Sequence, residues 1–296
     1  MEKSKVYFTS KINAESLVEI YKALGKDLNN SVGVKISTGE PGGHNYLKPE
    51  LIKNLVNLVN GTIIECCTAY GGRRQDPAMH WEAIKEHGFF DIAPCDIMDE
   101  HGEMELAVKN GFHLKKNIVG SSLEKYKQLI CLSHFKGHAM GGFGGALKNM
   151  SIGIASSHGK AYIHTASLTT DPGKLWDNLP QQDDFLESMA DATSSVIDYI
   201  GKDNIVYINV ANNLSVDCDC DSNPEEPKMA DIGIFASLDP VALDKACYDA
   251  VVNSTDSGKA SLIERMNSRH ATHIITASKK LGIGNDEYEI INIDNK

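Results

Sequence analysis

The sequence predicts an α/β fold with a mostly parallel sheet, flanking helices and two lobes. Three observations indicate this class: short apolar runs recur along the chain, amphipathic segments separate them, and glycine or proline stands at many of the boundaries. Strands that alternate with helices form βαβ units, in which the strands run parallel. Strands of such sheets are covered on both faces, so they read as continuous apolar runs.

Six apolar runs are the predicted strands, because short runs of this kind suit buried strands. They cover residues 6–9, 32–37, 62–66, 129–134, 205–210 and 232–236. Helices are predicted from apolar stripes and from residues that favour helix ends. These helices are 14–24 between Asn13 and Gly25, 49–60 beginning at Pro49, 77–87 between Asp76 and Gly88, 185–200, and 240–251 after Asp239.

The length of 296 residues fits one large domain or two lobes, at about 150 residues per domain. We interpret residues 1–296 as a single domain, divided at most into lobes of about 1–125 and 126–296, because no long linker is present.

Composition excludes several classes of protein. A net charge of −11 argues against nucleic-acid or acidic-membrane partners, which require a basic surface. No apolar run reaches the roughly 18 residues of a membrane span, and the start lacks the apolar stretch of a signal peptide. The seven cysteines are odd in number and irregularly spaced, which is typical of cytoplasmic thiols rather than a disulfide framework. The oligomeric state is left open.

The strongest local signal is LICLSHFKGHAMGGFGGALKNMSIGIA at residues 129–155. Glycines allow a backbone to approach a ligand closely, and the N-terminus of a following helix attracts anions. The segment fails the Walker pattern and GxGxxG, because Leu147 stands where both need glycine. We expect an anion or cofactor to bind here, on Gly141, Gly142, Gly144, Gly145 and Asn149. The alternative is a glycine turn that serves tight packing alone.

Histidines cluster around this turn: His134, His138, His158 and His164 fall within 31 residues. Such a group suggests proton transfer or metal binding, although any one of them could be structural. Lys148 is a candidate for phosphate binding or covalent attachment. We therefore predict His134, His138 and Lys148 as the catalytic residues.

Two other loops contribute candidate ligand-binding residues: Glu40 and His44 in the first, Arg74 and His80 in the second. Each loop follows a predicted strand. In parallel sheets, the carboxyl ends of the strands meet at one edge, where α/β proteins place their sites. We expect these loops and the glycine segment to form one pocket.

Cys218 and Cys220 flank Asp219 in an acidic loop. The two thiols could bind a soft or borderline metal or form a redox pair. The CxC spacing differs from that of common zinc knuckles, so buried thiols in an acidic loop are an equal alternative.

Six segments together carry a specific resemblance. They read KVYFTS at 5–10, GEPGGHNYLKPE at 39–50, YGGRRQDPAMH at 70–80, SHFKGHAMGGFGGALKN at 133–149, VDCDC at 216–220 and DIGIFASLDPVALDKACYD at 231–249. The chain resembles the uncharacterised iron–sulfur-centre proteins that share domain of unknown function 362. The resemblance covers nearly the whole length and implies an α/β fold with a shared pocket. Many relatives carry a ferredoxin-like insert with CxxCxxC motifs. This chain has none, which argues against a 4Fe–4S cluster.

The glycine–lysine segment is also similar to that of the nickel-pincer-nucleotide lactate racemase family. By order and spacing, this similarity implies that Lys148 anchors a cofactor, His138 moves protons and His164 binds metal.

The leading hypothesis is a cofactor- or metal-dependent enzyme that acts on a small anionic molecule. The candidate ligands could hold a metal ion. The enzyme could be either an oxidoreductase or an isomerase. The alternatives are a metal or cofactor carrier that uses Cys218, Cys220 and the histidines, or a racemase-like enzyme.

Overall fold

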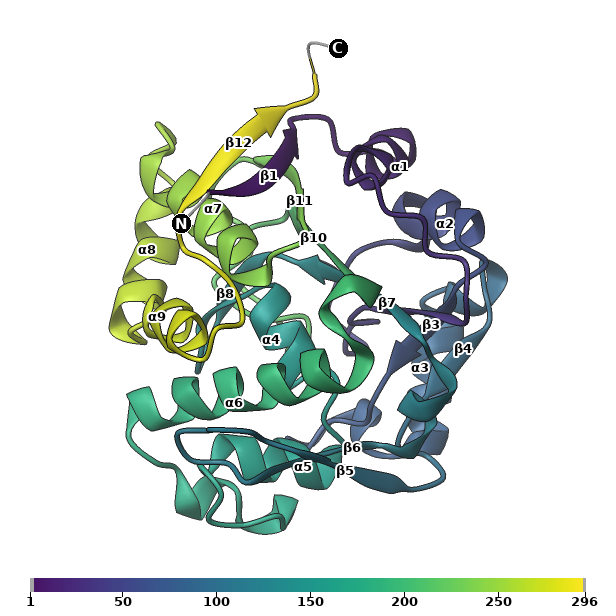
Figure 1. Ribbon diagram of the computed structural model, residues 1–296, viewed down its shortest axis with the longest axis vertical. Helices are drawn as coiled ribbons and strands as arrows, with labels where there is room; N and C mark the ends of the chain where they lie inside the picture. Colours follow the sequence, from purple (N-terminus) through teal and green to yellow (C-terminus); the bar gives the residue numbers. More distant parts are fainter. Residues whose placement is uncertain (1–2, 295–296) are drawn as a thin grey trace.

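The computed structural model describes residues 3–294, and its centre is an eight-stranded sheet (Figure 1). The strand order is β12-β1-β11-β10-β7-β2-β3-β4. The strands are β1 (Ser4–Thr9), β2 (Val32–Lys35), β3 (Thr62–Glu65), β4 (Cys95–Ile97), β7 (Gln128–His134), β10 (Ile205–Ala211), β11 (Gly233–Ser237) and β12 (Tyr288–Asn292). Neighbouring strands are parallel except that β11 runs antiparallel to β1 and β10. The predicted α/β fold with a mostly parallel sheet is confirmed.

Helices form at the five ranges predicted from apolar stripes and capping residues, and also at segments for which no range was predicted. They are α1 (Ala14–Ala23), α2 (Pro49–Leu58), α3 (Pro77–Glu86), α4 (Ala146–Ser151), α5 (Ser157–His164), α6 (Gln182–Ile200), α7 (Pro240–Asn253), α8 (Lys259–Ser268) and α9 (His273–Lys280). The side chains of Asn13, Asp76 and Asp239 accept hydrogen bonds from backbone N–H groups in the first turns of α1, α3 and α7. These bonds satisfy donors that a helix leaves unpaired at its start. No helix within residues 3–294 combines the length and apolar character needed to cross a membrane.

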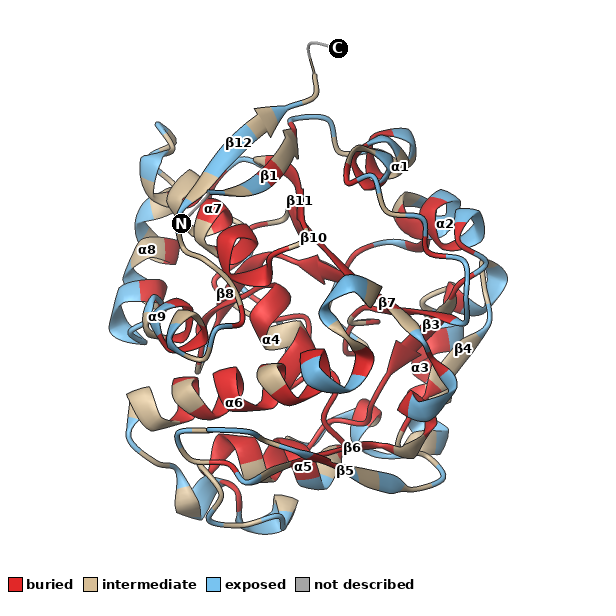
Figure 2. Ribbon diagram, in the orientation of Figure 1, coloured by how far each residue is buried: buried red, intermediate tan, exposed pale blue. Residues whose placement is uncertain are grey.

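The sheet separates two hydrophobic cores. Val34 and Ile130 point toward α1, α2 and α3, whereas Leu129 and Cys131 point toward α4, α6 and α7. Successive residues of a strand face opposite sides, so one strand supplies both cores. Figure 2 shows the buried residues following the central strands and the inward faces of the helices.

Two small hairpins lie outside the main sheet and were not expected from the sequence. One joins β5 (Glu103–Ala107) to β6 (Lys116–Gly120), and the other joins β8 (Lys136–His138) to β9 (Gly142–Gly144). In the second, Gly137 lies opposite Phe143 and His138 lies opposite Gly142. The glycine segment is therefore a short hairpin that leads directly into α4.

Candidate functional site

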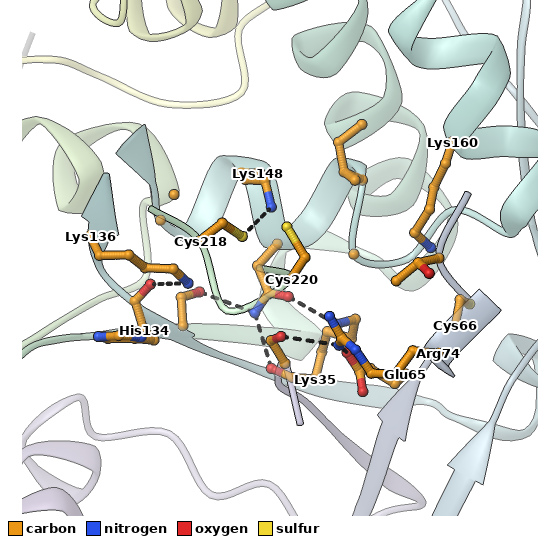
Figure 3. Close-up of a pocket in the computed structure, with 18 of the residues that line it drawn as sticks. Lys35, Glu65, Cys66, Arg74, His134, Lys136, Lys148, Lys160, Cys218 and Cys220 are labelled. Atoms are coloured by element: carbon orange, nitrogen blue, oxygen red, sulfur yellow. Dashed lines mark hydrogen bonds and ion pairs between the residues drawn. The ribbon is translucent and has the colours of Figure 1, made fainter. Parts of the chain in front are cut away.

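A pocket lies beside the carboxyl ends of β2, β3 and β7, where the sheet meets α4 and the 212–232 loop (Figure 3). This is the edge at which the sequence predicts a shared site. The predicted residues that line it are Arg74, His134, Gly144, Gly145, Lys148, Asn149, Cys218 and Cys220. Glu40 contacts Arg74, His138 contacts Cys218, and His80 contacts Glu65, which also lines the pocket.

The glycines of the segment serve different purposes. Gly142 has a φ of +78°, and a Cβ there would lie 2.5 Å from Cβ of Ala271. A Cβ on Gly145 would lie 2.4 Å from Oδ1 of Asp244. Asp244 is buried and accepts hydrogen bonds from the backbone N–H groups of Ala146 (2.8 Å) and Leu147 (2.9 Å). The start of α4 is thus already paired with a carboxylate, so side chains rather than this helix N-terminus are available to an anion.

Gly145→Ala is expected to destabilise the protein by about 1–3 kcal/mol, because the added methyl group displaces the Asp244 carboxylate from the start of α4. Gly144→Ala is the matched control, since its Cβ would come no closer than 3.5 Å to Lys148 and 3.8 Å to Lys136, which are ordinary contacts. Urea unfolding of both variants measures the difference. Equal stability of the two variants would refute the role of Gly145.

Cys218 is surrounded by hydrogen-bond donors. Nζ of Lys148 lies 3.6 Å from its Sγ, and both Cys220 and His138 form hydrogen bonds with it. The bond from Cys220 and the charge of Lys148 lower the pKa of the Cys218 thiol well below its usual value, despite burial. The pKa of Cys220 is raised, because its thiol is hydrogen-bonded to Cys218 and is partly removed from solvent. The pair therefore holds one thiolate, on Cys218, next to one thiol.

The protonation of the His138 ring follows from its hydrogen bonds. Nδ1 accepts from the backbone N–H groups of Gly141 (2.8 Å) and Met140 (3.2 Å), so it carries no proton. Burial lowers the pKa of His138 to about 4, which leaves the ring neutral at physiological pH. The proton is therefore on Nε2, which is the ring nitrogen free to donate to the Cys218 thiolate. Ligand atoms of His138, Cys218 and Cys220 all lie within 4.8 Å of one another, close enough to surround a metal ion.

Unpaired cations give the pocket its charge. Lys35, Lys148 and Lys160 line it, and within residues 3–294 none of them forms an ion pair with a carboxylate. Nζ of Lys35 instead donates to Oδ1 of Asn149 (3.0 Å), and Lys160 donates to the carbonyl oxygen of Ala155 (2.5 Å). Burial lowers the pKa of Lys35 to about 8, so it remains mostly protonated at neutral pH. Lys148 already faces the Cys218 thiolate, so an anion would balance mainly the charges of Lys35 and Lys160.

Arg74 belongs to a buried network that is balanced internally. Its guanidinium group donates to Glu65 (2.7 Å) and Glu40 (3.2 Å), and Nε2 of His80 lies 3.1 Å from the same Glu65 carboxylate. Each of these four side chains is nine-tenths buried or more. Arg74 lines the pocket, whereas Glu40 and His80 hold the network behind it.

Both ring nitrogens of His134 have hydrogen-bond partners. Nδ1 lies 2.8 Å from Asp219, and Nε2 lies 2.6 Å from the carbonyl oxygen of Asn212. The other oxygen of Asp219 accepts from Nζ of Lys136 at 2.7 Å. With both nitrogens engaged, His134 is placed to hold the cysteine loop against β7 rather than to exchange protons with a substrate.

The remaining predicted residues lie outside the pocket wall. His164 is buried between Tyr70 and Phe185, and its Nδ1 contacts the carbonyl oxygen of Lys160 at 2.7 Å. Burial lowers the pKa of His164 to about 3, so the ring is neutral and its Nε2 keeps a lone pair. His44 is 55% exposed and pairs with Glu226.

Comparison with known proteins identifies the family but not a reaction. The family model described as Domain of unknown function (DUF362) matches residues 32–249. The chain belongs to this family. No curated protein matches the chain.

Two solved structures resemble the DUF362 chain at low sequence identity. The lactate racemase apoprotein from Thermoanaerobacterium thermosaccharolyticum gives a TM-score of 0.50 at 15% identity, over 84% of this chain and 57% of the racemase. A protein from Thermotoga maritima gives a TM-score of 0.44 at 13% identity, over 80% of this chain and 57% of that protein. The chain thus spans little more than half the length of either. The racemase likeness indicates a shared fold.

Sequence reasoning missed several residues of the DUF362 pocket: Lys35, Glu65, Tyr70, Lys136 and Lys160. Two of them carried a usable signal. Lys35 and Glu65 are charged residues at the ends of otherwise apolar strands, where a charge needs a buried partner. Lys160 and Tyr70 gave no such signal, since lysine on a helix and tyrosine in a loop are ordinary.

Proposed function

We propose that this protein is a metal-dependent enzyme that acts on a small anionic molecule. Cys218 and Cys220 would hold the metal ion, and Lys35, Lys148 and Lys160 would bind the anion. The observation that carries the proposal is the position of a thiolate and a thiol beside lysines that lack carboxylate partners within residues 3–294.

The donor set of the cysteine loop fits a soft or borderline metal. Thiolate sulfur prefers ions such as zinc, nickel or iron over calcium or magnesium. The charges of Lys148 and Lys136 already favour the deprotonated state of Cys218, which is the state that binds metal. A bound metal would supply Lewis acidity to an anionic oxygen in the pocket.

His138 is a candidate for stabilising negative charge that develops on the substrate. Its neutral ring carries a proton on Nε2, and its side chain interacts with Cys218. The backbone bonds of Gly141 and Met140 fix the orientation of the ring. A neutral imidazole is too weak an acid to give up this proton, so the ring would donate a hydrogen bond from Nε2 to an anionic oxygen.

Elemental mass spectrometry of anaerobically purified protein, together with calorimetric titration of sulfate and lactate, tests this proposal. Near-stoichiometric metal and binding of an anion that weakens in Lys148→Met support it. Metal without anion binding would instead indicate a carrier, and the absence of both would reject the proposed site.

Anion binding is expected to weaken as pH rises through about 8, the pKa of Lys35. Below this pH Lys35 is cationic and attracts an anion, whereas above it the neutral amine loses a charge-assisted hydrogen bond. Such a bond contributes about 1.5–3 kcal/mol, so the affinity should fall roughly tenfold or more. Calorimetric titration with sulfate, whose own charge is constant over this range, measures the change. In Lys35→Met the fall near this pH should disappear, and its persistence would show that another group is responsible.

A second candidate function is a racemase-like reaction on a cofactor attached to Lys148. The racemase-like fold favours it, as do the neutral rings of His138 and His164 near Lys148. Intact-protein mass spectrometry distinguishes this candidate. A covalent adduct that is lost in Lys148→Arg would support it, and an unmodified chain from the native source would reject it.

A further inference from the structure

A second group of side chains of the kind that bind metal ions lies away from the pocket, between α6, α9 and the segment that joins β5 to β6. His113 comes from that segment, Asp184 and Glu187 come from α6, and His273 is the first residue of α9. In Figure 1, α9 lies beside the first half of α6, and the β5–β6 hairpin passes the other side of α6.

The ligand atoms converge on one carboxylate. Nε2 of His113 lies 2.7 Å from Oε2 of Glu187 and 3.7 Å from Oδ1 of Asp184. Nε2 of His273 lies 3.0 Å from the other oxygen of Glu187. Neighbouring ligand atoms in a tetrahedral zinc site lie about 3.4 Å apart, given bonds of about 2.0–2.1 Å. These separations bracket that distance.

The scaffold holds the ligands in place. Asp191, one α6 turn beyond Glu187, accepts hydrogen bonds from the backbone N–H groups of Phe112 (2.8 Å), His113 (2.8 Å) and Leu114 (2.9 Å). Asp184 and Glu187 are three residues apart, so they share one face of the helix. The side chains of His113, Glu187 and His273 are only 25%, 19% and 26% exposed, which limits their freedom before binding.

We infer that His113, Asp184 and Glu187 form a second metal site, which takes a borderline divalent cation such as zinc, nickel or cobalt, and that His273 holds the other oxygen of Glu187 in place. An imidazole and two carboxylates are ligands that these ions accept, and the two carboxylate charges match a divalent cation. The bound ion would tie the β5–β6 segment to α6. This inference does not depend on the proposed function of the pocket.

Cobalt and zinc titrations of the full chain in a Cys218→Ser/Cys220→Ser background test the inference, because this background removes the thiolates of the pocket. We expect one equivalent of cobalt with visible d–d absorption and no thiolate-to-cobalt charge-transfer band. His113→Ala or Glu187→Gln should weaken zinc binding by at least tenfold and abolish the rise in thermal midpoint that zinc causes.

The matched control is His270→Ala, because His270 is 61% exposed, lies between α8 and α9, and pairs with Asp183 of α6 at 2.8 Å. It should bind zinc as tightly as the parent. The inference is overturned if the parent binds no zinc, or if Glu187→Gln, with its circular dichroism unchanged, binds zinc equally well. It is also overturned if His270→Ala loses as much affinity as His113→Ala, since that would indicate diffuse chelation by surface histidines.

Discussion

Replacing both Cys218 and Cys220 by serine is expected to lower the affinity of the pocket for its metal by more than about 100-fold. Loss of groups that merely orient metal ligands costs about 10–100-fold, so loss of two thiolate ligands should cost more. Serine keeps the size of the side chain but is not deprotonated beside Lys148, so it offers a poor ligand. Competition with a chromophoric chelator under anaerobic conditions measures the affinity.

Cys95→Ser is the matched control for this experiment. Cys95 is a free, partly buried cysteine on β4, outside the pocket, and its thiol donates to the carbonyl oxygen of Ala93. It should leave the affinity of the pocket unchanged. Metal affinity that survives in the double variant, with its fold intact by circular dichroism, would show that the cysteine loop is not the metal site.

Glu65→Gln is expected to cause the largest loss of stability, about 3–5 kcal/mol, because it leaves Arg74 with a partly unpaired buried charge. The Glu65 carboxylate accepts hydrogen bonds from Arg74, from His80 and from the hydroxyl of Thr38. Burial alone would raise its pKa, but the charge of Arg74 and the bond with His80 outweigh burial and lower it. A carboxylate whose pKa is lower in the folded protein stabilises the fold fully at pH values above its pKa in the unfolded chain, about 4.3. This stabilisation is lost as the pH falls from there through the lower pKa of the folded protein.

Urea unfolding at pH 7 measures this loss, with Glu82→Gln as the control. Glu82 is 67% exposed and pairs with the neighbouring Arg73 at 3.2 Å, and surface pairs of this kind contribute about 0–1 kcal/mol. The difference between the two variants should therefore exceed about 2 kcal/mol. A Glu65 variant as stable as the Glu82 variant would mean that Arg74 is balanced without Glu65.

The fold was predictable because its central strands are mostly apolar. Val32, Ile63 and Ile130 lie in short apolar runs, which are typical of buried strands. The outer strands β4 and β12 lacked this signal. β4 has only three residues, and β12 has no fully buried position at the sheet edge. The β8–β9 hairpin was missed for a related reason, since its three-residue strands are too short to show a period.

The position of the pocket was predictable, but the contacts within it were not. Arg74 and His134 line one pocket at the expected edge of the sheet, while their roles stay predictions. The residues that contact the glycine segment could not be predicted from the neighbouring sequence. Asp244 follows Gly145 by 99 residues, and Cys218 follows Lys148 by 70. Those contacts depend on how α7 and the cysteine loop pack. They determine that Asp244 occupies the start of α4 and that Lys148 faces a thiolate.

X-ray absorption spectroscopy at the metal edge tests the central claim most directly. The anaerobically purified Glu187→Gln variant is the sample of choice, because it should lack the second site and report on the pocket alone. Two sulfur scatterers at about 2.3 Å are the predicted result, from Cys218 and Cys220. A metal bound only by nitrogen and oxygen, or a metal-free protein, would contradict the account.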